Sequence, residues 1–285
     1  MWTAEGWKDY ELIDCGGGQR LERWGGYLFS RPDPQAIWPR ALNQSEWDKA
    51  EAVYTKSGGG GGWTMLDIPG SFEIGYGDIR LIVRAMGFKH TGVFPEQVVN
   101  WDFMAGLLKN AKGANVLNLF AYSGGATVTA LAAGARVTHV DAAKGMVQLA
   151  RENVRASGLA NAPCRYIVDD CAKFVAREAR RGARYDAVIM DPPTYGRGPS
   201  GEMWRIEDQL YPLVEACVSL LSDTPLFFVV NSYTTGLSPS VSAYLLSRAL
   251  TGKGARIECD EIGLPVTSTG LVLPCGSTAR AVFGG

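Results

Sequence analysis

The sequence predicts an α/β protein in which a small β-rich domain precedes a seven-stranded, mostly parallel sheet with helices on both faces. The chain has 285 residues, of which 46% are hydrophobic, and this is enough to bury a sizeable core. Before about residue 95, short alternating runs are separated by glycines, a pattern typical of antiparallel strands. After that point, apolar strands alternate with helical stretches, as in a parallel sheet. We therefore expect a β-rich domain over residues 1–92 and an α/β domain over residues 93–285.

The β-rich domain is expected to contain one short helix over residues 43–56, with Ser45 as its N-cap. The glycine run of residues 57–63 is expected to be a flexible connection. It could instead cradle a phosphate, but the Lys-Ser or Lys-Thr pair of a phosphate-binding loop does not follow it. Strands are expected in residues 10–15, 20–32, 63–68, 71–77 and 78–85.

The α/β domain is expected to begin with a helix over residues 95–111, whose first residues, Pro and Glu, suit a helix N-terminus. Only a short loop joins the last two expected strands. These two strands must pair antiparallel, because a parallel return requires a long crossover. The strands are expected in residues 114–120, 136–141, 164–170, 185–191, 225–231, 255–262 and 279–283.

The first strand of the α/β domain leads into a glycine turn that is typical of a nucleotide-type cofactor site. In an open α/β sheet, ligands bind outside the carboxyl ends of the strands. A dinucleotide fingerprint would read G-x-G-x-x-G, whereas this turn carries only the adjacent pair Gly124 and Gly125. The incomplete fingerprint disfavours NAD as the cofactor.

Acidic residues end the next two strands. Asp141 ends the second strand, where a carboxylate can accept hydrogen bonds from both ribose hydroxyls. Asp169 and Asp170 end the third strand, where a carboxylate can accept from the adenine amine. Contacts to ribose and adenine without a pyrophosphate site describe S-adenosylmethionine better than NAD. Alternatively, these acids only cap the helices that follow them.

The fourth strand ends in Asp191-Pro192-Pro193, and Tyr195 follows closely. The two prolines fix the backbone and remove two N–H donors, so that the neighbouring carbonyls become rigid acceptors. Such a wall can hold a planar ring that bears an amine, and Tyr195 could stack on that ring. The alternative is a tight turn after a buried strand. The motif lies where this fold places active sites, and we therefore favour a function in catalysis.

Four segments, residues 118–135, 139–154, 168–175 and 190–195, resemble class I S-adenosylmethionine-dependent methyltransferases. More closely, they resemble the bacterial large-subunit ribosomal RNA methyltransferases that make 5-methylcytosine or 7-methylguanine. The resemblance covers about residues 88–283. It implies a Rossmann-like seven-stranded class I methyltransferase sheet, S-adenosyl-L-methionine as cofactor and ribosomal RNA as substrate. The expected cofactor-binding residues are Gln97, Phe120, Tyr122, Ser123, Gly124, Gly125, Asp141, Asp169, Asp170 and Cys171.

One departure from this family concerns the catalytic nucleophile. The 5-methylcytosine members carry a cysteine after the fifth strand, where this chain has Tyr233 and Thr234. Cytosine C5 needs prior addition of a thiolate at C6, whereas a guanine N7 or an amine can attack a methyl group directly. We therefore expect a nitrogen acceptor. Cys275 in the last hairpin is an alternative nucleophile, although no basic neighbour in the sequence would lower its pKa. The expected catalytic residues are Asp191, Pro192, Pro193 and Tyr195.

The formal net charge of -1 argues against nucleic-acid binding that depends on overall charge, but a local basic face remains possible. The basic residues at the end of the helix before the fourth strand are expected to be solvated. The PUA domain with which some members of the family bind RNA is not found in this sequence. The candidates for phosphate contacts are therefore Arg80, Arg84 and Lys89, and the helix-end group is Arg177, Arg180, Arg181 and Arg184.

Several functional classes are not expected. The six cysteines and two histidines lack the spacing of a zinc site, so no metal is expected. No apolar run could span a membrane and no signal peptide is evident, so we expect a cytoplasmic protein. The alternatives to RNA methylation are a small-molecule or protein methyltransferase, and a non-catalytic RNA-binding or assembly factor on the same fold.

Overall fold

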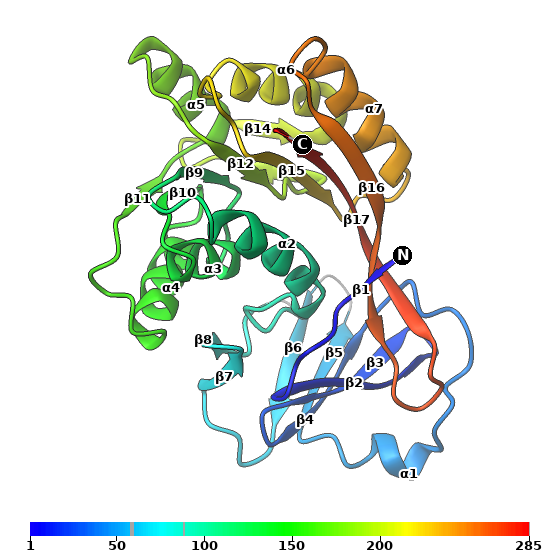
Figure 1. Ribbon diagram of the computed structural model, residues 1–285. Coiled ribbons are helices and arrows are strands. Elements are labelled where there is room, and N and C mark those ends of the chain that lie inside the picture. Colours follow the sequence, from blue (N-terminus) through cyan, green and yellow to red (C-terminus); the bar gives the residue numbers. More distant parts are fainter. Residues whose placement is uncertain (58–59, 88, 285) are drawn as a thin grey trace. The chain divides into compact units, whose positions relative to one another are not determined.

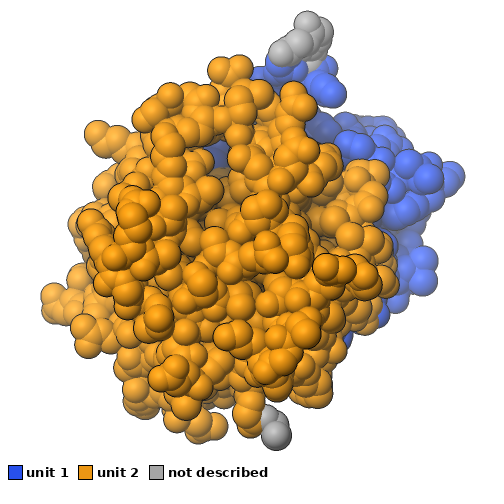
Figure 2. Space-filling model, turned by 90° about the horizontal axis from the view of Figure 1, so that it is seen from above, with its two compact units in different colours: residues 1–99, 263–275 blue, residues 100–262, 276–285 orange. Residues whose placement is uncertain are grey.

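The computed structural model describes residues 1–57, 60–87 and 89–284. The chain forms two compact units, shown in blue and orange in Figure 2. Unit 1 comprises Met1–Val99 and Gly263–Cys275, and unit 2 comprises Asn100–Ile262 and Gly276–Gly285. Unit 1 thus extends beyond the predicted boundary at residue 92 and takes up a late segment. The reason is that the turn after Pro265 bonds to strand β2: Thr267 N–H donates to Leu12 O at 3.0 Å.

Unit 1 contains a five-stranded sheet in the order β2-β3-β4-β5-β6, and a separate pair of strands, β7 and β8. The expected antiparallel pairing is found for β2 with β3, β3 with β4, and β5 with β6. Strands β4 and β5 instead pair parallel, because the long connection through helix α1 returns the chain in the same direction. The elements are β2 (Tyr10–Gly16), β3 (Gln19–Trp24), β4 (Tyr27–Pro32), α1 (Gln44–Trp47), β5 (Ala52–Ser57), β6 (Gly60–Met65), β7 (Phe72–Tyr76) and β8 (Ile79–Val83).

Two predictions for unit 1 are wrong. The helix expected over residues 43–56 is only the four-residue α1, capped by the side chain of Asn43, which accepts from Glu46 N–H, and not by Ser45. The glycine segment expected to be a flexible connection is strand where it is described: Ser57 ends β5 and residues 60–63 lie in β6, whereas residues 58 and 59 lie outside the described residues. A Cβ at Gly61 would lie less than 3 Å from the Tyr54 ring, so this strand needs glycine to pair beside a tyrosine.

Unit 2 contains the predicted sheet. Its seven strands lie in the order β16-β17-β15-β12-β9-β10-β11, and β17 pairs antiparallel with β15 whereas the central strands are parallel (Figure 1). An eighth strand, β1 (Trp2–Thr3), is the neighbour of β16, whose last residues from Gly263 on belong to unit 1 as β1 does. The predicted architecture is therefore confirmed. The strands are β9 (Asn115–Leu119), β10 (Arg136–Asp141), β11 (Cys164–Val168), β12 (Ala187–Met190), β15 (Phe227–Ser232), β16 (Arg256–Pro265) and β17 (Val272–Val282).

Helices cover both faces of this sheet. Helices α2, α3 and α4 lie on one face and α5, α6 and α7 on the other (Figure 1). The second face has a core of fully buried side chains that include Phe174, Val214 and Phe228. The described residues hold no helix that is long and apolar enough to cross a membrane. The helices are α2 (Val98–Leu108), α3 (Gly125–Ala132), α4 (Lys144–Ala156), α5 (Cys171–Arg180), α6 (Ile206–Val218) and α7 (Pro239–Ala249).

A short hairpin after the fourth parallel strand was not predicted. Strands β13 (Tyr195–Arg197) and β14 (Met203–Arg205) pair antiparallel between β12 and α6. Each strand has only three residues, and a run this short carries too little periodicity to be recognised in the sequence.

Candidate cofactor and acceptor site

The loop after β9 has an unusual backbone. Phe120 and Tyr122 have φ angles of 52° and 49°, and Gly124 has a φ of 84°. The left-handed region is uncommon for bulky residues and costs energy, so the surrounding structure must hold it in place. Two bonds do so: Tyr122 N–H donates to Asp141 Oδ2 at 2.8 Å, and Phe120 N–H donates to Cys171 Sγ at 3.4 Å. The expected cofactor residues of the three strand ends are thus bonded to one another.

The glycine pair of this loop is required by the packing of unit 2 itself. A Cβ at Gly124 would lie 2.8 Å from the Ala150 Cβ on α4, and a Cβ at Gly125 would lie 2.2 Å from the Trp101 ring on α2. Real Cβ atoms do not approach other atoms this closely. The two glycines therefore make room for side chains of α4 and α2, against which α3 packs.

Asp141, the predicted ribose ligand, accepts two backbone hydrogen bonds at the carboxyl end of β10. Its Oδ1 accepts from Ala143 N–H and its Oδ2 from Tyr122 N–H, both at 2.8 Å. Burial raises the pKa of Asp141, and the two backbone hydrogen bonds oppose this rise. A carboxylate offers about four acceptor positions, so about two remain for ribose hydroxyls.

The acids after β11 also have structural partners. Asp170 is the N-cap of α5, where Oδ1 accepts from Lys173 N–H at 2.9 Å. Asp169 forms an ion pair with Arg177 and accepts from Asp170 N–H at 2.8 Å. The capping interpretation is therefore correct for Asp170, and its Oδ2 has no hydrogen-bond partner among the described residues. Burial raises the pKa of the Cys171 thiol well above its usual value, so Cys171 lies there as a neutral group.

A buried histidine lies behind the loop. The exposed fraction of His139 is 0%, and its Nδ1 shares a 2.9 Å hydrogen bond with Thr127 Oγ1. Its Nε2 is buried and has no hydrogen-bond partner among the described residues. Burial lowers the pKa of His139 from 6.5 to about 3, because a charged imidazolium would be desolvated there.

This histidine makes the stability of the fold depend on pH. Below pH 6.5 the unfolded chain binds a proton at His139 and the native state does not, so the free energy of unfolding should fall by about 1.4 kcal/mol per pH unit from this residue. The measurement is denaturant unfolding at pH 7 and at pH 5.5. We expect His139→Gln to have a shallower pH dependence than the wild type. His90, whose pKa burial lowers to about 4, is the matched second case. Equal pH slopes for the wild type and His139→Gln would contradict the prediction.

The Asp191-Pro192-Pro193 segment leaves the carboxyl end of β12 beside the end of β15. Asp191 Oδ1 accepts from Asn231 Nδ2 at 2.9 Å. One residue beyond the prolines, Thr194 Oγ1 lies 2.8 Å from Thr234 Oγ1. Thr234, one of the two residues at which the resemblance expects a cysteine, therefore contacts the residue that follows the prolines.

Asn231 is a candidate site residue that the sequence does not single out. It is 2% exposed, and its Oδ1 lies 3.5 Å from Asn100 Nδ2. Asn100 Oδ1 in turn accepts from Arg280 Nη2 at 2.9 Å and from Thr278 Oγ1 at 3.2 Å. Because donors occupy Asn100 Oδ1, its amide nitrogen faces Asn231, and Asn231 is left to donate to Asp191. Only the folding of α2, β15 and β17 against one another brings this chain of hydrogen bonds together.

The hairpin after the prolines closes over the cofactor loop. Trp204 is 4% exposed, its Nε1 donates to Pro193 O at 2.6 Å, and its ring centroid lies 4.8 Å from that of Phe120. Tyr195, on the same hairpin, is 50% exposed and its hydroxyl donates to Met203 Sδ at 3.1 Å. The aromatic pair links the predicted cofactor loop to the predicted acceptor segment.

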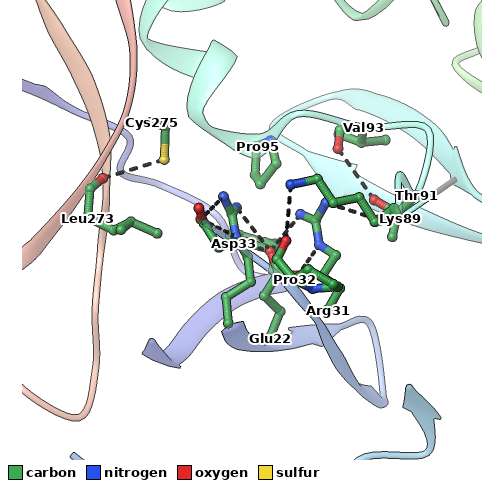
Figure 3. Close-up of polar contacts among 12 residues, drawn as sticks. Glu22, Arg31, Pro32, Asp33, Lys89, Thr91, Val93, Pro95, Leu273 and Cys275 are labelled. Carbon is green, nitrogen blue, oxygen red and sulfur yellow. Dashed lines mark hydrogen bonds and ion pairs between the residues drawn. The ribbon is translucent and has the colours of Figure 1, made fainter. Parts of the chain in front are cut away.

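Cys275 lies within strand β17 and belongs to unit 1, where it bonds to Leu273 O (Figure 3). Burial raises the pKa of its thiol well above the usual value, which opposes formation of a thiolate nucleophile. The same figure shows the buried Glu22, whose carboxylate pairs with Arg31 at 2.8 Å. Lys89, a predicted phosphate contact, donates to Pro32 O at 3.1 Å in this cluster. Lys89 is partly buried, and its ammonium group is hydrogen-bonded within unit 1.

Three other expectations concern Gln97, the arginines at the end of α5 and metal binding. Gln97 lies in a 3₁₀ turn, Pro95–Gln97, of unit 1, and its role toward the cofactor stays a prediction. Arg177 and Arg181 pair with Asp169 and Glu178, in keeping with the solvated helix end expected there. Among the residues that the structure describes, no group of three or more His, Cys, Asp or Glu could hold a metal ion.

A family model for S-adenosylmethionine-dependent methyltransferases matches residues 72–221. The chain belongs to this family. The methyltransferase is 35% identical to the S-adenosylmethionine-dependent methyltransferase from Agrobacterium tumefaciens, whose crystal structure it matches with a TM-score of 0.95 over 99% of this chain and 92% of that chain. A structure solved in complex with S-adenosylhomocysteine is 18% identical, covers 98% of this chain and 76% of that chain, and shares the fold with a TM-score of 0.72.

Two curated relatives are named as ribosomal RNA methyltransferases. The methyltransferase is 32% identical over 138 residues to ribosomal RNA large subunit methyltransferase K/L of Shewanella frigidimarina. It is 32% identical over 118 residues to ribosomal RNA large subunit methyltransferase I of Klebsiella pneumoniae. These matches cover 48% and 41% of this chain, and 19% and 29% of the relatives. The predicted family and cofactor, S-adenosylmethionine, are thus confirmed, and NAD is not the cofactor.

Proposed function

We propose that this methyltransferase transfers a methyl group to a base nitrogen of RNA, with ribosomal RNA as the favoured substrate, by direct attack and without a cysteine nucleophile. The observation that carries the proposal is the contact of Thr194, directly after the two prolines, with Thr234, one of the two residues at which the resemblance expects a nucleophilic cysteine. The relatives that act on ribosomal RNA support the substrate class.

The site residues fit the cofactor. Asp141 keeps acceptor positions for ribose, and Asp170 Oδ2 is available for the adenine amine. The backbone from Tyr122 to Gly125 would hold the methionine end. When bound, S-adenosylmethionine supplies an electrophilic methyl group on a sulfonium centre. The loop is already fixed by its bonds to Asp141 and Cys171, so little ordering remains to be done on binding.

Asp191 and the prolines would orient the acceptor. An amine that donates to Asp191 or to the rigid carbonyls of this segment is held with its lone pair toward the methyl group, and such alignment lowers the barrier. The nitrogen forms the new N–C bond while the C–S bond breaks and its electrons remain on sulfur. An exocyclic amine then releases a proton toward Asp191 or water. A guanine N7 releases none, and the product base is cationic.

The experiment uses methyl-labelled S-adenosylmethionine and separate pools of unmodified ribosomal RNA, transfer RNA, protein and small metabolites. We expect label in RNA, on a guanine N7 or an amine. Label in protein or in a metabolite would replace the RNA assignment by the alternative of a protein or small-molecule methyltransferase. A 5-methylcytosine product would contradict direct attack on the methyl group by a nitrogen.

Replacing the buried thiol provides a second check on direct attack. Because its pKa is raised and it lies within β17, we expect Cys275→Ser to keep the rate constant kcat of methyl transfer within about twofold of wild type. A loss of on the order of 100-fold, at unchanged S-adenosylmethionine affinity and unchanged fold, would instead indicate a thiolate mechanism. Cys217, equally buried on α6, is the matched control position.

A further inference from the structure

The β13–β14 hairpin has two chemically different faces. Tyr195 stands opposite Arg205, and Arg197 stands opposite Met203, whereas Gly196 and Trp204 form the pair between them. Side chains alternate between the faces of a strand, so the first four residues share one face. Trp204 turns to the buried face, where it packs on Phe120.

The outer face is exposed and cationic. Tyr195 and Met203 are 50% and 44% exposed, and Arg197 and Arg205 are exposed as well. Neither guanidinium forms an ion pair or a side-chain hydrogen bond with any residue that the structure describes. Two guanidinium groups without an ionic partner among the described residues thus lie beside an exposed ring, and this combination suits phosphates and an unpaired base.

The hairpin is held in place from behind and at its tip. Trp204 anchors it to Pro193 O, and Gln209 accepts from the Arg205 backbone N–H at 2.8 Å. Glu202, the acid within the hairpin, forms an ion pair with Lys173 and accepts from Ser200 N–H at 2.9 Å. Its charge is therefore balanced locally, and the outer face keeps its positive sign. The acids Glu207 and Asp208 begin the following helix and form no ion pair with Arg205.

We propose that this outer face binds a single-stranded segment of the RNA next to the acceptor base. Arg197 and Arg205 would contact phosphates, and Tyr195 would stack on a base, with Met203 packed along the ring. Guanidinium groups bind phosphate oxygens in a bidentate manner, and exposed aromatic rings are platforms for unpaired bases. The inference rests on the proposed function, since it names the part of the RNA that lies beside the Asp191 segment.

The test measures binding and methyl transfer separately. Binding of a short, labelled, single-stranded RNA of mixed sequence is followed by fluorescence anisotropy at several salt concentrations. We expect the double variant Arg197→Ala/Arg205→Ala to bind this RNA about 100-fold more weakly, from about tenfold per charged contact. Its slope of log K against log salt should be smaller by about 1.4, from two lost phosphate contacts. S-adenosylmethionine affinity should not change.

The control is Arg136→Ala/Arg184→Ala, which removes two exposed arginines near the amino ends of β10 and β12. Tyr195→Phe should keep binding and Tyr195→Ala should lose it. Equal RNA affinity and salt slope for the two double variants would overturn the inference, even if label transfer to RNA is observed. Wild-type binding that requires Arg197 and Arg205 would support it, even if the methylated atom is a different one. Binding of polyglutamate but not of RNA through these arginines would overturn it in favour of an acidic protein partner.

Discussion

Asp191→Ala is expected to abolish most methyl transfer while the protein still binds S-adenosylmethionine. Asp191 lies at the carboxyl end of β12 and is held by Asn231 at 2.9 Å. If it orients the acceptor, its loss removes an interaction that aligns the reacting nitrogen, and kcat should fall by on the order of 100- to 1000-fold. The measurement is initial-rate kinetics with the RNA substrate, together with calorimetric titration of the cofactor.

Asn231→Ala is expected to have a milder effect on methyl transfer than Asp191→Ala. It leaves the Asp191 carboxylate in place but removes the donor that orients it, so we expect a smaller fall in kcat, of about tenfold. Asp186 provides the control: it accepts from Asn115 N–H at 2.8 Å near the other end of the sheet, where Asp186→Asn should affect stability but not kcat at saturating substrate. Equal kcat values for wild type and Asp191→Ala would exclude the proposed role.

Asp141→Asn is expected to weaken S-adenosylmethionine binding by about 100-fold. Two hydrogen bonds from ribose hydroxyls to a carboxylate account for about 3 kcal/mol of binding free energy. The amide also places an N–H₂ group against Tyr122 N–H or Ala143 N–H, both of which donate to Asp141. The measurement is the Kd for S-adenosylmethionine of wild type and variant, with the unfolding midpoint recorded for each to separate binding from stability.

The affinity for S-adenosylmethionine should also depend on pH through Asp141. Burial raises the pKa of this carboxyl, and the ionised form is the better acceptor for ribose. Affinity should therefore be constant well above the raised pKa and fall as the pH falls through it. Asp141→Asn should remove this dependence. A wild type whose Kd is flat with pH, with Asp141→Asn equally tight, would show that the ribose is held elsewhere.

Local sequence pattern determined most of unit 2. Apolar strands alternating with helices predicted the parallel sheet, and the short last connection predicted its antiparallel last strand. A glycine turn and acids at two consecutive strand ends predicted the cofactor. These features are local because a strand buried on both faces is a continuous apolar run, and each cofactor contact in such a sheet follows a strand end. In unit 1, local pattern predicted less of the structure. The residues after α1 form β5 and not a helix. The glycines form β6, because cross-strand pairing with the residues around Tyr54 outweighs the local preference of glycine for turns.

Only the tertiary structure decided which long-range contacts fix the predicted site residues in place. The sequence determined the α/β class, the methyltransferase sheet, the family and the positions of Asp141 and Asp191. It did not show that Gly124 and Gly125 make room for α4 and α2, or that Asn231 joins Asp191 to a buried network. Nor did it show that a hairpin with Tyr195 on its outer face covers the cofactor loop. Such contacts join residues far apart in the chain, and their geometry exists only after the strands and helices have packed, so no spacing along the sequence encodes them.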